Sequence, residues 1–163
     1  PYGKLAQRLH ASGFFRSPDV WRAAGTDEQY AQWCRQQASA VSGKYDTDTD
    51  TGEIGCVYAH VRRISEGAGV GIKPPYCGIP LTDTEHRRQH DQGESAIVPA
   101  RHQADAKGYL ERLRIEYVSA WAKAAIKDTL GHESFGDIPP AELRAWAERN
   151  GVVQYLPNEY AEA

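Results

Sequence analysis

A short helix with two histidines on one face constrains the fold of this chain more than any other feature. The helix is expected to begin after Thr82, because Thr82 and Glu85 form a capping-box pattern, and to end at Gly93. His86 and His90 lie four residues apart within it. Their imidazoles therefore share one face of the helix and can bind a single divalent metal ion.

The residues before this helix predict a strand and a connecting loop. Residues 54–61 alternate as a strand does and carry His60 close to their end. We expect this strand to pair antiparallel with one near 39–43, through the polar turn at 45–53. Residues 66–80 hold four glycines and three prolines, which predicts a structured loop. Strand, loop and helix in this order predict a ββα unit whose concave side can hold one metal ion.

The flanking sequence predicts helices. Ser17 and Pro18 favour a helix start, and a long helix is expected over about 104–130, with a stop at Gly131. A last helix is expected from Pro139 onward. The fold class predicted is α+β, in one domain over 1–163. Its parts are N-terminal helices at 1–37, a ββα core at 38–95 and a C-terminal helical part at 96–163.

Composition limits the classes of protein to which the chain can belong. It has 163 residues, a formal net charge of −3, and 40% hydrophobic and 25% charged residues, as is usual for a soluble globular protein. No apolar run approaches the roughly 18 residues that a membrane span needs. The three cysteines form no C-x-x-C pair, which favours a reducing cytoplasm. Because the chain begins at Pro1 and contains no methionine, we expect it to be part of a longer polypeptide.

Basic residues gather around the histidines although the chain as a whole is acidic. Residues 60–90 contain five Lys or Arg against three Asp or Glu, so any nucleic-acid contact is expected to be local. The candidates for holding phosphate groups are Arg62, Arg63, Lys73 and Arg87. For each one alone, a solvated surface position is an equally good interpretation. A metal on the helical histidines, with His60 as a base beside it, is typical of a metal-dependent phosphodiesterase.

Three segments together carry a resemblance to a known family. They are A-H-V-R-R at 59–63, G-A-G-V-G-I-K-P-P at 67–75 and P-L-T-D-T-E-H-R-R-Q-H-D-Q-G-E at 80–94. In these the chain resembles the HNH, or ββα-metal, endonuclease superfamily. More narrowly, it is similar to the phage and prophage branch that includes the Ref type of recombination-associated nuclease. The core of the resemblance covers about residues 38–95.

The resemblance implies a role for each matching residue. His60 matches the general base that deprotonates the attacking water, and His86 and His90 match metal ligands on the motif helix. Asp83, one turn before His86, is a candidate for a further ligand; the other interpretation is that it only favours the helix dipole. The implied substrate is DNA, in phage recombination or processing, with a recombination protein or a further domain as partner. The expected cofactor is one divalent metal ion: zinc, manganese, nickel or magnesium.

Two departures from the family pattern keep an alternative open. Ala59 stands where many relatives have a metal-binding Asp or His, and Cys77 falls near the position of the central Asn. The alternative is a non-catalytic module in which the metal staples the ββα unit for DNA or protein binding. A hydrolase acting on another substrate has less support, because the helical H-x-x-x-H lacks the Glu of zinc peptidases.

Overall fold

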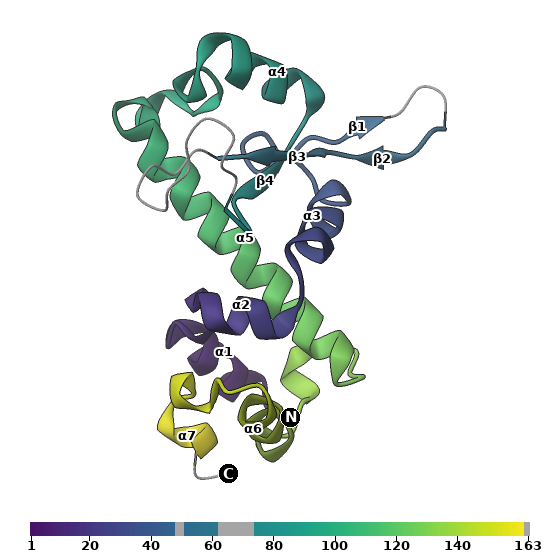
Figure 1. Ribbon diagram of the computed structural model, residues 1–163, viewed down its shortest axis with the longest axis vertical. Coiled ribbons are helices and arrows are strands. Elements are labelled where there is room, and N and C mark those ends of the chain that lie inside the picture. Colours follow the sequence, from purple (N-terminus) through teal and green to yellow (C-terminus); the bar gives the residue numbers. More distant parts are fainter. Residues whose placement is uncertain (48–50, 62–73, 162–163) are drawn as a thin grey trace. The chain divides into compact units, whose positions relative to one another are not determined.

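A computed structural model describes residues 1–47, 51–61 and 74–161 (Figure 1). The fold is mixed α+β, as predicted. The chain divides into two compact units: one comprises 1–26 with 118–163, and the other comprises 27–117. The predicted single domain over 1–163, with parts divided at residues 37 and 95, stays a prediction.

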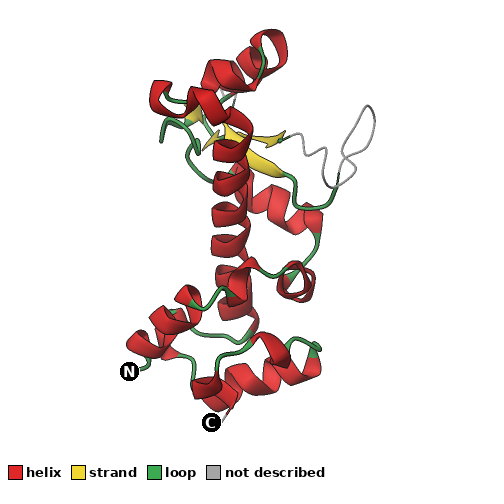
Figure 2. Cartoon of the chain, turned by 90° about the vertical axis from the view of Figure 1, so that its left-hand side faces the viewer, coloured by secondary structure: helices red, strands yellow, loops and turns green. Residues whose placement is uncertain are grey.

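The first unit is helical and has its own apolar core. Its helices are α1 (Gly3–Ala11), α2 (Pro18–Ala24), α6 (Pro140–Arg149) and α7 (Asn158–Ala161), with short 3₁₀ turns at Phe14–Arg16, Phe135–Asp137 and Val153–Tyr155. It also contains the second half of α5 (Ala106–Thr129), which Figure 2 shows as one continuous helix. The most deeply buried side chains of this core include Leu9, Phe14, Val20, Ile126 and Leu143.

The second unit holds the strands and the histidine-bearing helix. Its elements are α3 (Asp27–Arg35), β1 (Asp46–Thr47), β2 (Ile54–Gly55), β3 (Val57–His60), β4 (Gly78–Leu81) and α4 (Asp83–Gln92), followed by 3₁₀ turns at Glu94–Ile97 and Ala100–Asp105 and by the first half of α5. In the described residues β1 pairs with β2, and β3 pairs with β4, both antiparallel. The order β3, β4, α4 is a strand–strand–helix unit (Figure 1). Its core includes Ala59, Ile79, Leu81 and Leu110.

The predicted strand near 39–43 is wrong. The partner of 57–60 is β4, and that of 54–55 is β1. Residues around Ser39 form a turn, since Ser39 Oγ accepts hydrogen bonds from the main-chain N–H groups of Val41 and Ser42, both at 3.2 Å. A serine that bonds neighbouring main-chain groups competes with strand pairing, and this explains the difference.

The predicted loop over 66–80 is wrong at its end, where residues 78–80 belong to β4. Residues 62–73 lie outside the described part. Val61 N–H donates to Cys77 O at 2.8 Å, so the alternation of an antiparallel ladder leaves Pro80, opposite Tyr58, without a ladder bond to β3. A proline there forfeits no hydrogen bond to β3, which is why this strand tolerates it.

The helix predictions are confirmed. The Thr82–Glu85 box caps α4, and Gly93 follows its last residue. Helix α2 begins at Pro18, α5 ends at Thr129 and α6 begins at Pro140. None of the helices within residues 1–47, 51–61 and 74–161 is both long and apolar enough to cross a membrane.

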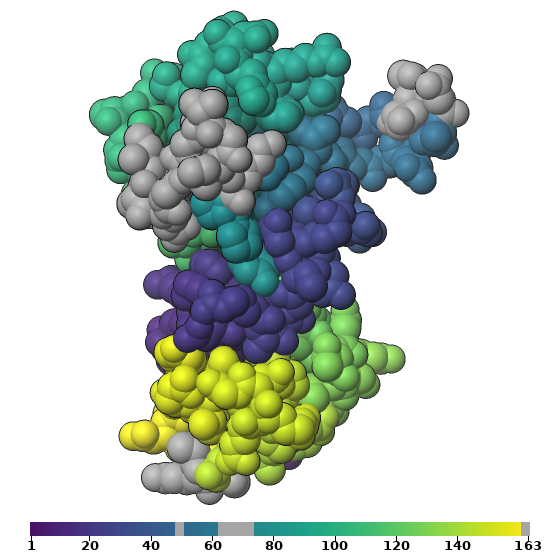
Figure 3. Space-filling view, viewed as in Figure 1, coloured from purple at the N-terminus to yellow at the C-terminus, as the bar shows by residue number. Residues whose placement is uncertain are grey.

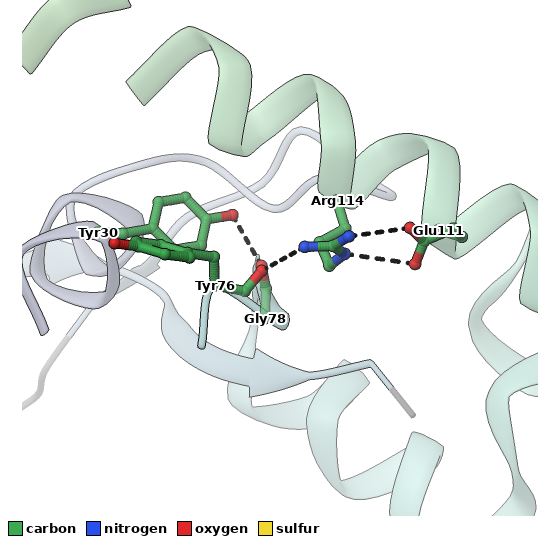
Figure 4. Close-up of polar contacts among 5 residues, drawn as sticks. All are labelled: Tyr30, Tyr76, Gly78, Glu111 and Arg114. Atoms are coloured by element: carbon green, nitrogen blue, oxygen red, sulfur yellow. Dashed lines mark hydrogen bonds and ion pairs between the residues drawn. The ribbon is translucent and has the colours of Figure 1, made fainter. Parts of the chain in front are cut away.

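A buried polar network fixes the backbone just before β4 (Figure 4). Arg114, on α5, is 2% exposed and donates from Nη1 to the main-chain oxygen of Tyr76 at 2.7 Å. Its other nitrogens donate to both carboxylate oxygens of Glu111, at 2.9 and 3.3 Å. Tyr30, on α3, donates its hydroxyl to Gly78 O at 2.7 Å. Two helices thus hold this segment, α5 at Tyr76 and α3 at Gly78, which lies opposite His60.

Candidate metal and catalytic site

The start of α4 is fixed by hydrogen bonds that reach beyond the helix. Glu85 N–H donates to Thr82 Oγ1 at 3.2 Å, and Thr82 N–H donates to Glu85 Oε1 at 2.9 Å. Ser39 Oγ donates to the same Glu85 oxygen at 2.6 Å. Asp83 N–H donates to Asp46 Oδ2 at 2.6 Å. These bonds set the direction in which the histidines of α4 point.

The two helical histidines face each other. The Nε2 atoms of His86 and His90 are 3.0 Å apart, with ring centroids separated by 4.6 Å. His90 is exposed and His86 is half-buried, and the space-filling view shows α4 at the molecular surface (Figure 3). Partial burial and the neighbouring His90 lower the pKa of His86, against an opposing effect of Asp83. His86 therefore favours the neutral form, which is the form that binds metal.

The donor set fits part of a metal shell. Since Zn–N bonds are about 2.1 Å long, two imidazole nitrogens 3.0 Å apart can bind one ion at adjacent positions. Among the described residues, no three His, Cys, Asp or Glu side chains are grouped so that they could hold a metal together. His60 and Asp83 therefore do not complete a three-residue set with the pair. The remaining positions of an open, catalytic type of shell are filled by water or substrate.

His60 is the last residue of β3 and is half-buried. Its ring lies beside that of Tyr58, with 5.1 Å between the centroids. Ala59 points to the other face of the strand, where it is 0% exposed within the apolar core. The strand position before His60 therefore serves packing rather than metal binding.

The structure joins His60 to α4 through a residue that the sequence reasoning missed. Gln89 lies between His86 and His90 on α4, and its Nε2 donates to the main-chain oxygen of His60 at 3.2 Å. Its Oε1 is buried and has no hydrogen-bond partner within the part of the chain that the structure describes. The spacing of the histidines gave no signal for this contact, because a glutamine on a polar helix is usually solvated.

The predicted phosphate-binding residues are only partly described. Arg87 is exposed and pairs with Asp83 across one helical turn, with Nη2 2.8 Å from Oδ2. Exposed pairs of this kind contribute about 0 to 1 kcal/mol, so both side chains can exchange partners readily. The predictions for Arg62, Arg63 and Lys73 lie outside the described residues.

The three cysteines have no features of a nucleophile. Cys34, Cys56 and Cys77 are buried. Burial raises the pKa of the Cys34 thiol to about 12 and that of Cys56 to about 11. Both thiols are therefore protonated at neutral pH, whereas the reactive form of cysteine is the thiolate.

Comparison of the chain with protein-family models, curated proteins and solved structures gave no match. The functional argument therefore depends on the residues and geometry of the site.

Proposed function

We propose that this protein is a metal-dependent endonuclease of the HNH type that hydrolyses DNA phosphodiester bonds. The observation that carries the proposal is the pair of facing imidazoles, His86 and His90, on α4. This helix directly follows β4, which pairs antiparallel with β3, the strand that ends at His60. The motif resemblance over residues 38–95 supports the choice of DNA as substrate. It also supports a role in phage or prophage recombination or processing.

His86 and His90 would hold one divalent ion. Imidazole ligands suit zinc or nickel well. When bound, the ion supplies charge neutralisation at the scissile phosphate and at the leaving oxygen. His60 accepts the proton of the attacking water, a role that histidine fills more often than any other side chain. General-base catalysis of this kind contributes about 100- to 10,000-fold in rate. Arg87, once released from Asp83, would contact a flanking phosphate from the same helix.

A plasmid-nicking assay tests the proposal. Purified protein is incubated with supercoiled DNA and either zinc, manganese, nickel or magnesium, with and without EDTA. We expect nicked and linear products that disappear in EDTA and return when metal is added in excess. Absence of cleavage with every metal, for supercoiled, single-stranded and branched DNA alike, would contradict the proposal.

A non-catalytic, metal-stapled module for DNA or protein binding is the second candidate. The observation favouring it is the burial of Ala59 in the core, which leaves the strand without a metal ligand at that position. Such a module binds metal through His86 and His90 and gains stability from it, yet cleaves no DNA. The nicking assay distinguishes the two candidates directly.

A further inference from the structure

We infer that Gln89 is a positioning residue that fixes His60 relative to the His86–His90 pair. The inference rests on the proposed function and names a residue of that site to which the sequence motifs assign no role. It starts from the hydrogen bond that Gln89 Nε2 donates to the main-chain oxygen of His60, at 3.2 Å.

The strand geometry explains why the His60 carbonyl needs a partner from outside the sheet. His60 lies opposite Gly78, while the next residue, Val61, donates to Cys77 O at 2.8 Å. Main-chain bonds alternate along an antiparallel pair, so the carbonyl of His60 points away from β4. Gly78, opposite His60, likewise makes its main-chain bonds with side chains. Its oxygen accepts from Tyr30, and its N–H donates to Tyr58 Oη at 3.0 Å.

The helix geometry explains why Gln89 can couple the two parts of the site. Gln89 follows His86 by three residues and precedes His90 by one, so it lies on the neighbouring face of α4. Its amide is held in one orientation, because turning it over would place Oε1 against the His60 carbonyl and lose the bond. A shift of β3 relative to α4 therefore breaks this contact before it disturbs the histidine pair.

Because Gln89 contacts His60 but not the imidazoles, its substitution should affect the position of His60 and leave metal binding unchanged. Gln89 supplies no atom to the imidazole pair, so its loss leaves both ligands on a capped helix. His60, however, loses the bond between its own backbone and α4. Residues that orient a catalytic or metal-binding group typically change activity by about 10- to 100-fold when substituted. Retained metal with reduced turnover is the pattern that distinguishes this role from a purely structural one.

The test uses Gln89→Met, which keeps the length of the side chain and removes the donor, and Gln92→Met as its control. Gln92 lies on the same helix and is exposed. Zinc affinity, thermal stability, kcat and KM for plasmid cleavage, and the carbonyl carbon resonance of His60 are measured for both variants. For Gln89→Met we expect wild-type zinc affinity, a kcat reduced about 10- to 100-fold and a shifted His60 resonance. Gln92→Met should match the wild type in every measurement.

Three outcomes would overturn the inference, and they are distinguishable. An unchanged His60 resonance in Gln89→Met shows that the contact does not exist. A wild-type kcat in the presence of a shifted resonance shows that the contact does not position the base. A wild-type protein that binds zinc but cleaves no DNA removes the proposed function, and the positioning role with it.

Discussion

Arg114 Nη1 lies 2.7 Å from the main-chain oxygen of Tyr76, and this contact ties α5 to the segment that leads into β4. We expect Arg114→Met to lower the free energy of unfolding by about 2 to 4 kcal/mol, because it leaves Glu111 without its cation and removes a buried donor. This loss of unfolding free energy is smaller than that expected for breaking a fully buried ion pair, because the Glu111 side chain is 24% exposed. Urea denaturation measures the change.

Arg112→Met is the matched control. Arg112 lies on the same helix and pairs with Asp105 at 3.5 Å, with both side chains more than half exposed. Its replacement should cost about 0 to 1 kcal/mol. Equal effects of the two substitutions would show that the Arg114 network contributes no more than a surface pair.

Gly78→Ala tests the packing beside His60. A Cβ on Gly78 would overlap the ring of Tyr58, whose hydroxyl is bonded to Gly78 N–H and, at 3.3 Å, to Asp27. Because the ring cannot move without breaking these bonds, we expect a loss of about 1 to 3 kcal/mol. Gly3→Ala is the control, since open space surrounds that position. Thermal and urea unfolding of both variants make the comparison, and a neutral Gly78→Ala would contradict this packing.

Acid should weaken the start of α4 through Glu85. Burial raises the pKa of this carboxyl, but hydrogen bonds from Ser39, Ser42 and Thr82 outweigh burial, and the pKa lies below the ordinary value of 4.5. A lowered carboxyl pKa adds stability that is fully present above pH 4.5 and is lost as the pH falls through the lowered value. Glu85→Gln keeps an acceptor oxygen without the charge, so its free energy of unfolding should depend less on pH in this acidic range.

Denaturant titrations from about pH 7 to about pH 3 measure the effect. Glu53→Gln, at an exposed carboxylate in the same unit, is the control. Identical pH dependences of wild type and Glu85→Gln would show that the hydrogen bonds of the capping box do not favour the ionised carboxyl.

Zinc should bind once per chain and stabilise the fold. At a free concentration of about 100 times its dissociation constant, zinc should raise the free energy of unfolding by about 2.7 kcal/mol. His86→Ala and His90→Ala each remove one coordinating nitrogen and should abolish most of this gain. His10→Ala, at an exposed histidine of the other unit, should retain it. Full zinc stabilisation of both helix variants would locate the metal elsewhere.

Local signals in the sequence were sufficient to predict the helices and the facing histidines. The cap of α4 depends on Thr82 and Glu85, three residues apart, and the imidazole pair depends on a spacing of four. Both are properties of a single helix, so they can be derived from spacing alone. The same holds for Pro140 at the start of α6.

The strand pairing depends on contacts that spacing does not encode. The partner of residues 57–60 follows a long glycine- and proline-rich segment, and β4 itself contains Gly78 and Pro80, which disfavour a strand prediction. The contact of Gln89 with His60 spans 29 residues and depends on how α4 crosses the end of β3. Only the tertiary arrangement makes this glutamine different from the other polar residues of the helix.

The most direct test of the central claim compares His60→Ala with His86→Ala, measuring DNA cleavage and bound zinc on the same samples. If His60 is the base and His86 a ligand, His60→Ala should lose cleavage by about 100-fold or more and keep its zinc, while His86→Ala loses both. Parallel loss of zinc in both variants would make His60 a ligand and assign the base to another group. Full cleavage by His60→Ala would contradict the proposed mechanism.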